Sequence, residues 1–191
     1  MEYNKCFWAI LLGTLNLVSW GNCAATSKNT EYLLIPERST YTYINPEFCG
    51  SDLSVTIRRL NRTTFSLSAV INYLKDIEDA ENSVEFFQFL NNEYKKTGII
   101  ISAPICDMIG DPDLNIYKEY MMDGIHGNMP ECDGTFPKGQ YFVKDAVVAS
   151  EIKKTIFLPG KWKAVFQCTN KDDVIIFIGE FYFTIDEKLV T

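Results

Sequence analysis

The sequence predicts an all-β fold, an antiparallel β-sandwich with one short helix inserted between Cys106 and Cys132. Three observations predict it. Apolar and polar residues alternate with period two along most of the chain, which is typical of strands with one buried face. Short polar sequences join successive strands at hairpin distance. Only one segment shows apolar residues at helical spacing.

The first predicted hairpin pairs a strand over 53–57 with a strand over 65–73 through the polar link at Asn61. A third strand is predicted over 84–94, after the polar stretch 76–83. Apolar residues occur there on both parities, so both sides of this strand are expected to contact apolar groups. Further strands are predicted over 140–148, 161–169 and 174–185. The last two are joined by the turn-rich sequence 170–173, which favours a hairpin.

The final strand places large apolar residues on one face, with Gly179 among them. These residues are Ile175, Phe177, Phe181, Phe183 and Ile185. A glycine among large neighbours leaves a gap, which either a ring from the facing sheet or a ligand fills.

The one predicted helix begins after Asp111 and ends before Gly124. Asp111 and Asp113 supply a cap and first-turn acid, and Pro112 fits the first turn. Apolar residues, including Tyr117 and Met121, then recur at helical spacing. We therefore expect a short helix between the cysteines of this segment.

The composition predicts a folded chain whose partner is not a nucleic acid. The 191 residues include 18 Lys+Arg and 25 Asp+Glu, a net charge of −7. Phosphate binding needs a basic face, which this balance argues against. With 47% hydrophobic residues the chain has enough apolar surface for a packed core. One domain over 24–191 is predicted.

Residues 1–23 have the layout of a secretory signal peptide. A short polar start is followed by an apolar run and then by small residues, and cleavage is expected after Cys23 or Ala25. We find no integral membrane segment, because the most apolar later stretch, 174–185, contains Glu180 and is too short to span a bilayer. The predicted location is extracellular.

Cysteine usage agrees with secretion. Once Cys6 and Cys23 leave with the leader, Cys49, Cys106, Cys132 and Cys168 remain, an even set suited to two disulfides. Three pairings are possible, and spacing does not choose among them. Asn61 begins an Asn-Arg-Thr acceptor at a polar turn, so glycosylation is expected there.

Catalytic motifs are missing from the sequence, so no catalytic residue, cofactor or metal site is predicted. His126 is the only histidine, and no nucleophile elbow or phosphate-binding loop accompanies it. Carboxylates are numerous, which makes chance proximity of two uninformative. Asp107, Asp111 and Asp113 suggest calcium, but Pro112 breaks such a loop and helix capping explains them better. An enzyme is not expected.

Three short blocks carry a family resemblance. The inserted segment with Tyr-Lys-Glu-Tyr at 117–120 leads to Gly-Asn-Met-Pro-Glu-Cys at 127–132, and two further blocks lie at 138–141 and 158–163. Together with the leader, this series resembles the insect chemosensory protein B family, which is similar to the ganglioside-activator branch of the ML lipid-recognition proteins. Asp133 stands where relatives tend to have proline.

The resemblance implies a cup-like β-sandwich whose sheets part enough to hold an acyl chain or a similar apolar ligand. It also implies pairing of Cys106 with Cys132 and of Cys49 with Cys168. Chemosensory members of the family are associated with perception of cuticular hydrocarbons and other pheromones.

The candidate cavity wall consists of aromatic and apolar residues from alternating strand faces, with a lip from the inserted helix. An aromatic-rich face is also typical of ordinary sandwich core, and Trp162 suits an inter-sheet anchor better than a rim position. Met121 and Met122 either form an adaptable lip or dock the helix. The candidates are Phe65, Leu67, Phe87, Phe89, Tyr117, Met121, Met122, Tyr141, Val143, Trp162, Phe166, Phe177, Phe181 and Phe183.

The sequence thus predicts a secreted, non-enzymatic carrier or presenter of a small hydrophobic ligand or lipid, in line with the resemblance to chemosensory proteins. The alternative is an extracellular interaction module with a solid sandwich that modulates a membrane receptor or ion channel. A weaker third option is a secreted hydrolase whose carboxylates meet only in the fold.

Overall fold

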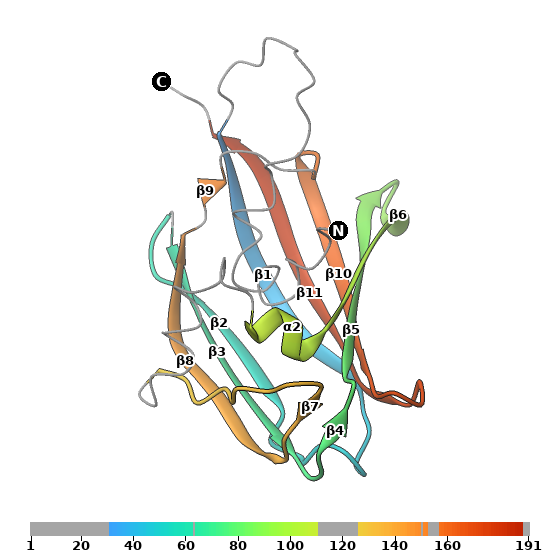
Figure 1. Cartoon of the computed structure of the whole chain (residues 1–191). Helices are drawn as coiled ribbons and strands as arrows, with labels where there is room; N and C mark the ends of the chain where they lie inside the picture. The colour runs from blue at the N-terminus through green and yellow to red at the C-terminus, as the bar shows by residue number, and fades with distance from the viewer. Residues whose placement is uncertain (1–30, 63, 111–125, 150, 153–156, 189–191) are drawn as a thin grey trace.

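A computed structural model describes residues 31–62, 64–110, 126–149, 151–152 and 157–188. Nearly all of this part of the chain is antiparallel β-structure, which confirms the predicted sandwich. Figure 1 shows β2, β3 and β8 in one layer at the lower left and β1, β11, β10 and β5 in the other. No helix in the described ranges is long and apolar enough to cross a membrane.

The larger layer is a six-stranded sheet in the order β6-β5-β10-β11-β1-β9, which we call the large sheet. Its strands are β1 (Glu31–Ile44), β5 (Glu81–Leu90), β6 (Glu93–Pro104), β9 (Glu151–Ile152), β10 (Gly160–Thr169) and β11 (Ile175–Lys188).

The other layer, the small sheet, has the order β2-β3-β8. Its strands are β2 (Ser54–Arg59), β3 (Thr64–Tyr73) and β8 (Gly139–Ala149). A two-stranded ladder pairs β4 (Ile77–Glu78) with β7 (Thr135–Phe136). Helix α2 (Ile105–Gly110) directly follows β6 and contacts β6 and β7.

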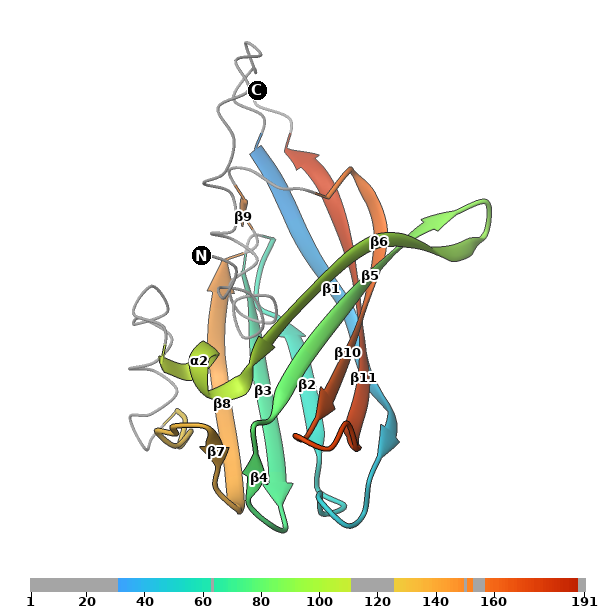
Figure 2. The same ribbon diagram turned by 45° about the vertical axis from the view of Figure 1, so that its right-hand side comes forward.

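Five of the six predicted strands are confirmed within a few residues, as β2, β3, β8, β10 and β11. The sixth prediction, one strand over 84–94, is wrong. The chain turns at Asn91 and Asn92, and β6 returns antiparallel to β5. Figure 2 shows this hairpin extending beyond the rest of the large sheet. The predicted helix over 111–124 lies outside the described residues.

The core lies between the sheets and follows the predicted alternation. On β10, Trp162, Ala164, Phe166 and Cys168 are buried at every second position. The β10–β11 register pairs these four with Phe183, Phe181, Gly179 and Phe177 in turn, so the shared face of the final strand is confirmed from Phe177 onward. Both strands therefore present one inward face to the small sheet.

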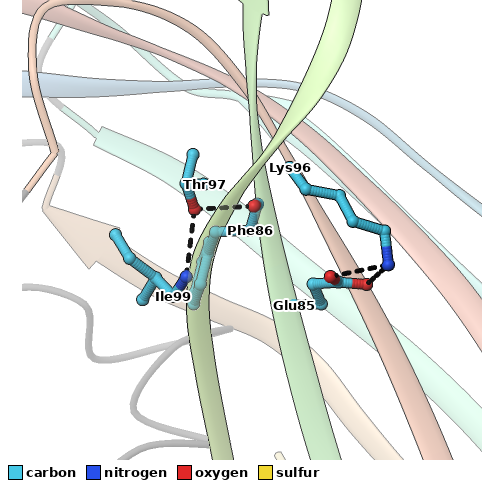
Figure 3. A network of polar contacts seen from close by, with 5 residues as sticks. All are labelled: Glu85, Phe86, Lys96, Thr97 and Ile99. Atoms are coloured by element: carbon cyan, nitrogen blue, oxygen red, sulfur yellow. Dashed lines mark hydrogen bonds and ion pairs between the residues drawn. The ribbon is translucent and has the colours of Figure 1, made fainter.

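A β-bulge bends the β5–β6 hairpin. Glu85 pairs with Ile100 and Phe87 pairs with Lys96, so three residues of β6 oppose the single residue Phe86. Thr97 links the two strands there, because its hydroxyl donates to the Phe86 carbonyl (2.8 Å) and accepts from the Ile99 amide (3.2 Å), as Figure 3 shows. The side chain thus replaces ladder hydrogen bonds that the bulge removes.

Candidate ligand cavity between the sheets

A cavity of about 50 Å³ lies between the two sheets, beside α2. Both sheets, α2 and the segment before β7 contribute to its wall. In chain order its lining is Tyr41, Val55, Ala69, Val70, Ile71, Tyr73, Asn82, Ile105, Met129, Phe166 and Phe177. None of these residues is charged or a histidine.

Three aromatic rings form the wall on the large sheet. Tyr41 packs edge-on against Phe177, with ring centroids 5.8 Å apart. Phe166 leans over Gly179, where an added Cβ would lie 2.5 Å from the ring. The gap predicted at Gly179 is therefore filled by a ring from the neighbouring strand of the same sheet, neither from the facing sheet nor by a ligand.

The wall on the small sheet is less completely buried. Val55 pairs with Ala69 across the β2–β3 ladder, and Ile71 faces the same side as Ala69. All three are half-buried although they face the interior, whereas Phe166 and Phe177 opposite them are buried. This contrast indicates that the cavity communicates with solvent along β2 and β3.

Asn82 is the amide side chain in this largely apolar wall, which also includes two tyrosines. Asn82 is 1% exposed, and its register neighbours are Cys168 on β10 and Ala103 on β6. Neither its side-chain nitrogen nor its side-chain oxygen has a hydrogen-bond partner. Buried polar groups are nearly always paired, so this amide calls for an explanation.

Tyrosine and cysteine groups gather near the cavity in a low-dielectric environment. Burial raises the pKa of Tyr41, and burial followed by the neighbouring Cys168 and Cys49 raises that of Tyr73. Burial also raises the pKa of Cys49 to about 11, and burial with the nearby Cys49 raises the pKa of Cys168. These four groups are therefore uncharged at neutral pH.

The predicted disulfide between Cys106 and Cys132 is present. It ties the start of α2, where Ile105 lines the cavity, to the segment that carries Met129. Cys49 and Cys168 are both buried and are free thiols in the structure. Their pairing stays a prediction.

The predicted cavity residues are distributed over three places. Phe166 and Phe177 line the cavity. Seven others are buried in the surrounding core, where Trp162 donates from Nε1 to the Leu158 carbonyl (2.8 Å), as suits an anchor. These seven are Phe65, Leu67, Tyr141, Val143, Trp162, Phe181 and Phe183. For them a ligand-contact role stays a prediction.

Two candidates lie on the outer face of the large sheet. Phe87 alternates with the buried Phe86 and lies beside the Lys163 ammonium, 4.8 Å from the ring centre. Phe89 packs against the Tyr94 ring at 5.0 Å. Tyr117, Met121 and Met122 lie outside the described residues.

Sequence reasoning missed most of the lining. Tyr41 belongs to β1, which was not predicted, and Ile105 begins α2. Asn82 precedes the predicted start of its strand at residue 84. Its parity with Val84 and Phe86 was the available signal, because it places an amide on an otherwise apolar inward face.

Two solved structures show distant similarity to this fold. No protein-family model matches the chain, and no curated protein matches it. Chicken MD-1 complexed with lipid IVa is similar over 84% of this chain and 93% of that chain, with 14% identity and a TM-score of 0.34. A Niemann-Pick type C2 protein from Japanese carpenter ant is similar over 78% and 90%, with 12% identity and a TM-score of 0.30. TM-scores this low support no inference about function, so we base the proposed function on the cavity.

Proposed function

We propose that this protein carries or presents a small hydrophobic ligand between its two sheets. The observation that supports the proposal is the inter-sheet cavity, whose wall is apolar except for Asn82 and the tyrosines Tyr41 and Tyr73 and whose side along β2 and β3 is half-buried. Ligand sites of this kind are concave, mostly apolar and equipped with few polar groups.

A ligand larger than a few heavy atoms must enlarge this cavity. An apolar cavity known to bind benzene has about 150 Å³, against about 50 Å³ here. Among the described strands no backbone ladder joins the large sheet to the small sheet. The sheets can therefore part, or the rings of Tyr41 and Phe166 can rotate, without breaking a ladder. Burying a ten-carbon chain contributes about 8 kcal/mol before association costs.

The first test combines native mass spectrometry with uptake of a fluorescent acyl probe. The chain is expressed in a secretory host, weighed under native and denaturing conditions, delipidated and titrated with the probe. Release of lipid in fixed stoichiometry and saturable probe uptake are expected. A clean ligand-free mass together with no probe uptake contradicts the proposal.

Two variants locate the binding site. Phe177→Asp places a carboxylate in the cavity wall and is expected to abolish uptake, whereas Phe89→Asp on the outer face leaves uptake intact. Ala69→Phe fills the cavity without adding charge, so it also blocks uptake and serves if Phe177→Asp does not fold. Uptake that persists in a folded Phe177→Asp or Ala69→Phe variant contradicts this assignment.

Secretion, glycosylation at Asn61 and a role in chemosensory perception complete the proposal. Asn61 is exposed at the turn between β2 and β3, where an oligosaccharide is accessible. The leader over 1–23 and the single domain over 24–191 stay predictions. The denaturing mass tests cleavage and glycan together.

The small volume of the cavity favours one second candidate, an interaction module with a solid sandwich. In that case the ligand-free protein binds a receptor or ion channel through its surface. Clean ligand-free protein that takes up no probe supports this candidate.

A further inference from the structure

We infer that Asn82 selects ligands with an uncharged polar head group, one that both donates and accepts hydrogen bonds, such as an alcohol or a primary carboxamide. This inference rests on the proposed function and names its ligand class. The cavity then binds amphiphiles in preference to plain hydrocarbons, with the polar head inside.

The position of Asn82 in the sheet explains why the amide is directed inward. Its parity matches Val84 and Phe86, both buried in the core, so its side chain leaves β5 on the inward face. The backbone of Asn82 is engaged in ladders with β6 and β10. Only the side-chain amide therefore remains to be paired.

The neighbouring polar groups do not pair with this amide. Tyr41 and Tyr73 line the same cavity, and Cys168 is the register neighbour, but none of them hydrogen-bonds Asn82 Nδ2 or Oδ1. A buried amide without partners is unfavourable, so a group that enters the cavity and pairs with it gains affinity. The cavity of about 50 Å³ holds such a head group.

The chemistry of the wall excludes a charged head group. The lining residues carry no lysine, arginine or histidine that would neutralise a carboxylate. Burial of an unpaired charge is strongly unfavourable. The Asn82 amide offers two N–H donors on Nδ2 and an acceptor oxygen, Oδ1. A hydroxyl is small and pairs with part of this set, whereas a carboxamide can pair with Nδ2 and Oδ1 at the same time.

The test compares ligands of matched size on delipidated protein. Decanol and undecane have the same number of heavy atoms, and decanoate carries a charge at pH 7. Displacement of the fluorescent acyl probe gives their relative affinities. We expect decanol to bind at least about tenfold more tightly than undecane, and decanoate to bind more weakly than decanol.

Variants assign this preference to the amide. Asn82→Leu keeps the side-chain size and is expected to bind decanol and undecane equally. Phe89→Leu, on the outer face of the large sheet, is the control and keeps the preference. Asn82→Ala serves if Asn82→Leu does not fold. In the wild type, the side-chain amide resonances of Asn82 shift with decanol and not with undecane.

The possible results separate this inference from the proposed function. Equal binding of decanol and undecane by the wild type overturns the inference, assigns the amide to bound water and leaves the carrier function standing. Tighter binding of decanoate, or a preference that survives in Asn82→Leu, also overturns it. Failure of all ligands and of the probe overturns the proposed function.

Discussion

Gly179 decides where the Phe166 ring lies. A Cβ at this position would be 2.5 and 2.8 Å from two ring carbons of Phe166 and 3.4 Å from the Tyr41 ring. Gly179→Ala therefore forces the ring to move within a packed core, and we expect the free energy of unfolding to fall by about 1 to 3 kcal/mol. Urea unfolding monitored by circular dichroism measures the change.

A double-mutant cycle with Phe166→Leu isolates this contact. Phe166→Leu alone loses packing contacts, but it also removes the ring with which the Cβ of Gly179→Ala would clash. The two changes are therefore expected to be non-additive, with the double variant more stable than the sum predicts. Strict additivity would show that the ring and Gly179 do not interact.

Glu180 gives the outer face of the large sheet a pH-dependent stability. Burial raises its pKa, but hydrogen bonds from Tyr182 and Lys163 and the nearby positive charges outweigh burial, so the pKa lies below its ordinary value of 4.5. A lowered pKa in the folded state stabilises the protein above the unfolded pKa, and this stabilisation is lost as the pH falls through the folded value.

Glu180→Gln is therefore expected to lower the free energy of unfolding by about 1 to 2 kcal/mol at pH 7 and by much less below the folded pKa. Denaturant unfolding at several pH values between 7 and 3 measures the difference. Glu93→Gln is the control, because its ion pair with Lys95 is exposed and contributes little. An equal difference at every pH would refute the role of ionised Glu180.

At the scale of the element, the β5–β6 hairpin depends on a two-residue turn. Asn91 and Asn92 have φ values of 53° and 67°, and Leu90 pairs with Glu93 across them. Asparagine tolerates this left-handed region, glycine tolerates it better and a β-branched residue does not. Asn92→Gly is expected to raise stability by a few tenths of a kcal/mol and Asn92→Val to lower it by about 1 kcal/mol or more. Thermal unfolding of the two variants measures the difference in stability. Equal melting temperatures for Asn92→Gly and Asn92→Val would contradict a left-handed backbone conformation at this position.

This turn also shows where sequence reasoning ended. Period-two alternation located five strands, because one buried face per strand leaves a pattern that needs no tertiary information. The Asn-Asn turn was overlooked because apolar residues occur at both odd and even positions on either side of it. The segment was therefore predicted as one continuous strand. β1 was missed although it pairs along much of β11. Between residues 32 and 44 only Leu34 is buried, so the strand has little of the contrast between two faces that alternation detects.

At the scale of the whole molecule, the site was less predictable than the fold. Phe166 and Phe177 were predicted from alternation. Alternation predicts which residues point inward, but side-chain packing determines which of those residues line a cavity. Phe87 and Phe89 show the converse, because a strand that is apolar on both faces gives no sign of which face meets the other sheet. Asn82 was missed because the predicted strand began at residue 84, whereas β5 begins at Glu81.

The number of disulfides is a property of the whole molecule that a mass measurement settles. Alkylation of the denatured, unreduced mature chain counts its free thiols. No alkylated cysteine is expected if Cys49 and Cys168 pair as the resemblance implies. Two alkylated cysteines would show that both remain the buried thiols of the structure.

The disulfide between Cys106 and Cys132 joins stability to ligand binding. It closes a loop with a sequence separation of 26, so restriction of the unfolded chain contributes about 3 to 4 kcal/mol. It also holds Ile105 and Met129, which border the cavity from outside both sheets. Replacing both cysteines by alanine is therefore expected to lower the free energy of unfolding by about that amount and to weaken probe uptake. Probe uptake is measured under conditions where the variant is fully folded. Unchanged uptake would show that the two sheets alone form the site.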